Sequence, residues 1–223
     1  MSSKSDLTPD RWRERFQRSY ETDQCYPAAV HAALRSADHV LGTDIAKRND
    51  LKAVSRRMGY RRRFSTPADA MQNTAFRRFL GTYGLQYAEE SKAPDPIKRL
   101  RELARSDDVS FPLVSVHLEF LTEHRGVQLK GVDLDLNSHA VLVLKVGEDD
   151  VDFFDGNFQP ERLPGVRERM PLVKFLSFWE RDPYRPLFVE YITRKEKAAR
   201  PPPRSKAKTI ESYVIGGKQS HES

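Results

Sequence analysis

Near residue 110 the spacing of apolar residues changes from that of helices to that of strands, and this change limits the folds open to the chain. Small and apolar residues over 27–34 predict a helix packed deep in a core. Further helices are predicted at 43–58, 66–82, 95–105 and, among the strands, 171–180. Segments rich in β-branched and aromatic residues predict strands at 112–118, 139–146, 151–155 and 187–192. Helices followed by an antiparallel sheet make the expected fold class α+β.

The chain is expected to hold one globular domain between two polar ends. Its 223 residues, 38% of them hydrophobic, suit a single core of ordinary size. Residues 1–16 form a leader and a first helix, residues 17–193 the folded domain, and residues 194–223 a basic tail with a proline triplet that we expect to stay extended.

Cysteine usage and hydropathy point to a cytoplasmic protein. No stretch approaches the ~18 consecutive apolar residues of a membrane span, and the first residues lack the pattern of a signal peptide. We therefore expect no membrane partner. The single cysteine, Cys25, excludes an internal disulfide framework and leaves too few thiols for a structural zinc site, as is usual in a reducing compartment.

The net charge of +6 comes almost entirely from the tail. Residues 194–208 carry seven lysines and arginines against one glutamate, whereas residues 1–193 carry 30 basic and 29 acidic residues. A second basic segment lies at 47–63, with eight basic residues and one acidic residue. Solvated surfaces explain both segments most simply. If these segments form a binding surface, the favoured partner is acidic, and nucleic acid is a less favoured alternative.

Cys25 stands at the expected start of the helix over 27–34. Backbone N–H groups and the helix dipole favour an anion at this position, so a thiol there is a better nucleophile at neutral pH. Taken alone, a single cysteine is more often a small apolar residue of a core. Its significance depends on which side chains the fold brings to it.

His139 and Asp155 are expected to be neighbours. His139 begins one predicted strand and Asp155 ends the next, and residues 147–150 between them have the composition of a hairpin turn. In an antiparallel pair the start of one strand lies beside the end of the other. A carboxylate bound to one ring nitrogen would fix the histidine tautomer and leave the other nitrogen to take a thiol proton.

The order cysteine, histidine, aspartate, on a helix, a strand and a strand end, resembles that of the papain-like cysteine peptidases. It is most similar to the branch that processes bacteriocin leaders after a double glycine. The segments that carry this resemblance lie within residues 17–193 and are Asp23-Gln24-Cys25 with Pro27-Ala28-Ala29, Asn137-Ser138-His139-Ala140-Val141, Asp155, Phe175 to Trp179, and Leu187 to Ile192. The resemblance implies a papain-like α+β domain that acts on a peptide or protein substrate. Cys25 would be the nucleophile, His139 the base and Asp155 the orienting residue.

The sequence departs from the family pattern around the cysteine. The family places a glutamine of the oxyanion hole six residues before its cysteine, and Ser19 occupies that position here. Gln17 and Gln24 are the candidate replacements. The family also tends to have glycine or tryptophan after the cysteine, where this chain has Tyr26. Three functions stay open: a peptidase, an acyltransferase or transglutaminase-like enzyme, and an inactive papain-fold module that binds through its basic segments.

No cofactor or metal is expected. The other histidines show no spacing typical of a metal site. Residues 81–84 contain two glycines but lack the lysine and the strand-to-helix context of a nucleotide-binding loop, and they are interpreted as a helix end.

Overall fold

The computed structural model describes residues 25–60, 70–90, 93–105, 109–124, 126, 138–156 and 166–195. Within these residues a six-stranded sheet has the order β1-β6-β2-β3-β4-β5, and every neighbouring pair is antiparallel. The strands are β1 (Leu85–Glu90), β2 (Ser110–His117), β3 (Ser138–Val146), β4 (Asp150–Asp155), β5 (Val166–Pro171) and β6 (Val189–Arg194). The helices are α2 (Cys25–Leu41), α3 (Ile45–Arg48), α4 (Leu51–Arg57), the 3-10 helix η3 (Ala70–Gln72), α5 (Thr74–Thr82), α6 (Pro96–Leu103), α7 (Glu119–Glu123) and α8 (Leu172–Glu180). The expected α+β fold, with a helical half packed on an antiparallel sheet, is confirmed.

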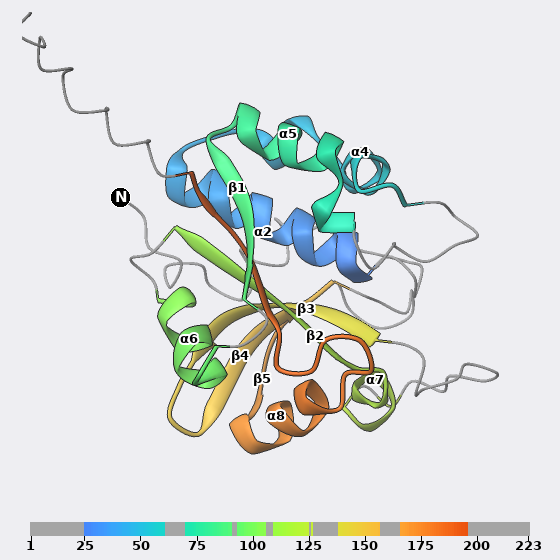
Figure 1. Ribbon diagram of the computed structural model, residues 1–223, viewed down its shortest axis with the longest axis vertical. Coiled ribbons are helices and arrows are strands. Elements are labelled where there is room, and N and C mark those ends of the chain that lie inside the picture. The colour runs from blue at the N-terminus through green and yellow to red at the C-terminus, as the bar shows by residue number, and fades with distance from the viewer. Residues whose placement is uncertain are drawn as a thin grey trace, which may run out of the picture.

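Helices cover both faces of the sheet. Figure 1 shows α2, α4 and α5 on one side and α6, α7 and α8 on the other. Each face has its own apolar core: one contains Ala140 and Leu142 of β3 with residues of α2 to α5, and the other contains Val141 and Val143 with residues of α6 to α8. Because side chains alternate along a strand, β3 contributes to both cores and is buried on both sides.

Helix α2 packs closely on the sheet because its buried side chains are small. Alanines fill much of its inner surface, and Pro27 lies in its first turn, where the missing N–H costs no helical hydrogen bond. Gly156, just after β4, lies directly under this turn. A Cβ atom added to Gly156 would come within 2.6 Å of the Cβ of Ala28, so the contact requires glycine.

Several predicted elements differ from those observed. The helix predicted at 43–58 is two helices, because the Asp50 side chain accepts a hydrogen bond from the Ala53 N–H and starts α4 anew. The helix predicted at 66–82 begins only at Thr74, where Asn73 caps α5, and residues 61–69 lie outside the described part. α7 and two strands, β1 and β5, were not predicted. β1 ends in two glutamates, and β5 has charged residues in its centre, so neither has a clear apolar period.

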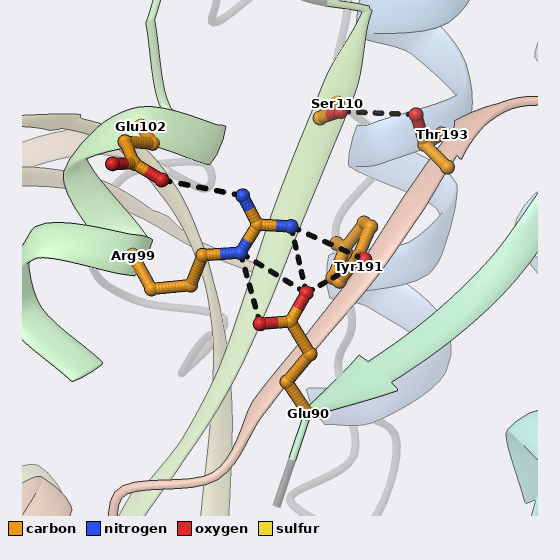
Figure 2. Close-up of polar contacts among 6 residues, drawn as sticks. All are labelled: Glu90, Arg99, Glu102, Ser110, Tyr191 and Thr193. Atoms are coloured by element: carbon orange, nitrogen blue, oxygen red, sulfur yellow. Dashed lines mark hydrogen bonds and ion pairs between the residues drawn. The ribbon is translucent and has the colours of Figure 1, made fainter. Parts of the chain in front are cut away.

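A polar cluster joins α6 to β1 and β6. We call Glu90, Arg99, Glu102 and Tyr191 the Glu90 cluster (Figure 2). Arg99 donates to both carboxylate oxygens of Glu90 at 2.7–3.0 Å, and the Tyr191 hydroxyl donates to Glu90 at 2.9 Å. Its charged side chains remain about one third exposed or more.

None of the helices in the described residues combines the length and the hydropathy that a membrane span needs.

Candidate active site

Cys25 is the first described residue of α2, as the sequence predicted. Its thiol is free and half-buried. The close contact between Gly156 and Ala28 places this first turn over the end of β4. The candidate nucleophile therefore lies at the end of the sheet where β4 finishes and β3 begins.

His139 and Asp155 form the pair that the sequence predicted. His139 Nε2 lies 2.8 Å from Asp155 Oδ1, and both side chains are fully buried. A buried carboxylate that accepts from one ring nitrogen fixes the orientation of the imidazole. Nδ1 is then the ring nitrogen left to face a thiol.

A β-bulge puts the two side chains on one face. β3 and β4 pair with Val146 opposite Val151, but the register shifts by one residue at Leu144. The shifted register places Asp155 level with Val141, on the same face as His139. Without the bulge, Asp155 would lie opposite Leu142 and point to the other face of the sheet. Nothing in the residue pattern indicates this extra residue, although the proximity of His139 and Asp155 depends on it.

The Cys25 thiol interacts with the His139 ring and affects its pKa. Burial by itself would lower the pKa of His139, but the Asp155 carboxylate and then the Cys25 sulfur outweigh burial and raise it to about 10. Among the described residues, buried Nδ1 has no hydrogen bond of ordinary geometry. The sulfur is thus the second polar group whose interaction with the ring raises its pKa.

Phe120 covers the imidazole, a role that the sequence analysis missed. Its ring stacks on that of His139 with centroids 5.5 Å apart and an angle of 17° between the planes. Phe153 and Phe178 pack edge-on against Phe120. This apolar cover keeps water from the hydrogen bond between His139 and Asp155, which strengthens their electrostatic interaction.

A second buried polar group adjoins the site, and we call Tyr26, Tyr87, Arg185 and Glu190 the Glu190 cluster. The hydroxyl of Tyr26, the residue after Cys25, donates to the Glu190 carboxylate. Tyr87 donates to the same carboxylate at 2.7 Å, and Arg185 also bonds to it. From the sequence alone, Tyr26 is only a departure from the family pattern, because its hydrogen-bond partner lies 164 residues away.

The remaining predicted site residues are not placed. Gln17 and Gln24, the candidates for the oxyanion hole, lie outside the described residues, as does Ser19. Residues 61–63 of the basic segment 47–63 and most of the segment 194–208 also lie outside the described residues. In the described part of the chain, no group of three or more histidine, cysteine, aspartate or glutamate side chains is arranged to hold a metal ion.

Comparisons with known proteins give a similarity to solved structures. No family model matches the sequence, and no curated protein matches it. Among solved structures, the chain is similar to the peptidase domain of Streptococcus ComA, described as a bi-functional ABC transporter involved in a quorum sensing pathway. The two sequences are 14% identical, and the match covers 80% of this chain and 97% of that chain with a TM-score of 0.47.

Proposed function

We propose that this protein is a cysteine peptidase-like hydrolase that cleaves a peptide or amide bond through a thioester on Cys25. The observation that carries the proposal is the buried bond between His139 and Asp155 at 2.8 Å, beside a thiol at the start of a helix. A histidine whose tautomer is fixed by a carboxylate and whose other nitrogen serves a nucleophile is the arrangement that acyl transfer requires.

Acylation uses the proton that His139 holds. With a pKa of about 10, raised by Asp155 and Cys25 against the effect of burial, the ring is an imidazolium at neutral pH. An imidazolium and a helix N-terminus both favour the thiolate form of a cysteine. The sulfur attacks the carbonyl carbon, and a C–S bond forms while the carbonyl oxygen takes the negative charge. The C–N bond then breaks, and Nδ1 of His139 gives its proton to the leaving amine.

Deacylation reverses these roles with water. Neutral His139 takes a proton at Nδ1 from the attacking water. The C–S bond then breaks, the acid product departs, and the sulfur is again a thiolate beside the imidazolium. Asp155 keeps its proton-free form throughout and stabilises the charge on the ring. An amine in place of water would give amide transfer, which is the acyltransferase alternative.

Labelling of the single cysteine tests the activated thiol. The full-length protein is treated with iodoacetamide at neutral pH, and the modified fraction is followed by intact mass. We expect labelling at least about tenfold faster than in urea-unfolded protein, and a fall to the unfolded rate in His139→Gln. His39→Gln, at the other end of α2, is the matched control. Equal and slow labelling of wild type and His139→Gln would contradict the proposal.

Turnover is tested with peptides. Because of the resemblance to leader-processing peptidases, the first substrates are synthetic peptides with a double glycine, and cleavage is read by mass spectrometry with Cys25→Ala as the control. An added amine separates the two reactions, since hydrolysis yields a free carboxylate and transfer yields an amide. Fast labelling without either product would leave only the binding-module alternative, in which the basic segment 47–63 or 194–208 recognises an acidic partner.

A further inference from the structure

The residue that follows Cys25 is tied to strand β6. The Tyr26 hydroxyl donates to the carboxylate of Glu190, which also accepts from Tyr87 at 2.7 Å and from Arg185. Tyr87 comes from β1, and Arg185 from the segment between α8 and β6. The carboxylate is therefore held by the sheet and by the neighbouring loop independently of α2, and it offers Tyr26 a fixed acceptor.

Because Glu190 is buried, the loss of a hydrogen bond to it is costly. Glu190 is 2% exposed, and burial raises the pKa of its carboxyl, whereas the hydrogen bonds and the charge of its donors lower it. A buried carboxylate that lacks a hydrogen-bond donor carries a large desolvation penalty. Loss of the bond to Tyr26 would leave this carboxylate with one donor fewer, so the bond is favoured in the folded protein.

The other contacts of α2 are mostly apolar, and the fit of Gly156 under Ala28 limits how close the first turn comes to the sheet. The inner surface of the helix is largely alanine, and apolar contacts are not directional. A hydrogen bond has a defined distance and angle, so it sets where the first turn stops. The bond from Tyr26 starts one residue from the thiol, which makes it the directional contact best placed to set the distance between sulfur and imidazole.

We infer that Glu190 is a positioning residue for Cys25 and acts through the Tyr26 hydroxyl. This role rests on the proposed function, since it concerns the alignment of the same thiol with His139. It does not place Glu190 in contact with substrate. It assigns a role in the site to a buried carboxylate that lies outside the proposed triad.

Removal of one hydroxyl tests this role. Tyr26→Phe keeps the aromatic ring and deletes only the donor to Glu190. Tyr191→Phe is the matched control, because it deletes a hydroxyl that donates to Glu90 on the opposite side of the same sheet. Both full-length variants are labelled at Cys25 with iodoacetamide between pH 5 and pH 9, about the range in which thiols titrate, and their melting temperatures are measured in parallel.

In Tyr26→Phe we expect the labelling rate at neutral pH to fall about tenfold, because a small displacement of a reacting group has an effect of this size or larger. The pH of half-maximal labelling should also rise, whereas Tyr191→Phe should match the wild type in both. A purely structural role would lower the melting temperature without moving the pH profile. Wild-type labelling and an unchanged profile in Tyr26→Phe would overturn the positioning role.

Variants of the acceptor give a second measurement. Glu190→Leu removes the acceptor, and Glu190→Gln keeps one oxygen, so the glutamine variant should label faster than the leucine variant. The reverse order would overturn the inference. If wild-type protein labels no faster than unfolded protein, the proposed function fails and the positioning role fails with it. Fast wild-type labelling that Tyr26→Phe leaves unchanged rejects the positioning role alone.

Discussion

Two clusters of this domain use the same side chains for different purposes. The Glu190 cluster and the Glu90 cluster each join a glutamate to an arginine and at least one tyrosine, and both glutamates lie in the β1–β6 pair of strands. Burial raises the pKa of Glu190, whereas hydrogen bonds from Arg99 lower the pKa of Glu90. The burial of a polar cluster, and not its composition, therefore decides which charge state the fold favours.

The largest expected effect is in the pair of His139 and Asp155, which lies outside both clusters and is as buried as Glu190. Asp155→Ala removes the partner of His139 Nε2 in a fully buried site. We expect turnover to fall about 100-fold and labelling to fall toward the rate of the unfolded protein, because the ring loses both its orientation and its charge partner. Glu90→Ala, in the wetter cluster, should keep the wild-type rate. Equal losses in the two variants would remove the functional contrast between the regions.

Removal of an arginine compares the two clusters in stability. Arg185→Leu leaves the Glu190 carboxylate buried without its cation, and we expect a loss of about 3 kcal/mol in the free energy of unfolding. Arg99→Leu breaks a bond between side chains that are about one third exposed, and the expected loss is no more than about 1 kcal/mol. Urea denaturation measures both. Similar losses would mean that burial does not separate the clusters.

Gly156→Ala tests the close contact beneath α2. The added methyl group would meet Ala28, and relief of this contact requires the first turn to move away from the sheet. We expect a loss of about 2 kcal/mol in stability and slower labelling of Cys25. Gly81→Ala, with open space around the added atom, is the control on α5. An unchanged labelling rate in Gly156→Ala would show that the helix tolerates this shift.

The pH dependence of stability should follow the sign of each pKa shift. The raised pKa of His139 gives stability that is full below pH ~6.5 and is lost as the pH rises toward about 10. Asp155→Asn removes the main cause of the rise, so its curve of unfolding free energy against pH should be flatter in this window. Urea titrations from neutral to alkaline pH measure both proteins. A wild-type curve as flat as that of the variant would contradict the raised pKa.

The smallest expected effects are the opposite slopes of the two glutamates. The raised pKa of Glu190 gives stability at low pH that is lost as the pH rises, and the lowered pKa of Glu90 gives stability above its ordinary pKa that is lost as the pH falls. Relative to wild type, Glu190→Gln should therefore gain stability as the pH rises from acid to neutral, and Glu90→Gln should lose it. Urea denaturation from acid to neutral pH measures this comparison. Slopes of the same sign would contradict the contrast.

Local signals explain what the sequence could predict. The small apolar residues of α2, the strong β-forming runs of β3 and β4, and the turn between them are visible in the sequence, and from them followed the proximity of His139 and Asp155. β1 and β5 were missed because pairing with neighbouring strands, and not their own apolar period, makes them strands. Tyr26 and Glu190 could not be linked to the site, because their contact joins segments far apart in the chain. Phe120 was missed because it lies in α7, a helix that was not predicted.

The extra residue at Leu144 makes hairpin length as important as residue identity. A homologous chain that lost one residue between Val143 and Val146 would still contain cysteine, histidine and aspartate in the same order, and a comparison of motifs would score it as intact. Its aspartate would nevertheless project into the core beneath α2, away from the imidazole. Engineered insertions in this domain should accordingly be confined to the turn at 147–149, where an added residue leaves the pairing of β3 with β4 untouched.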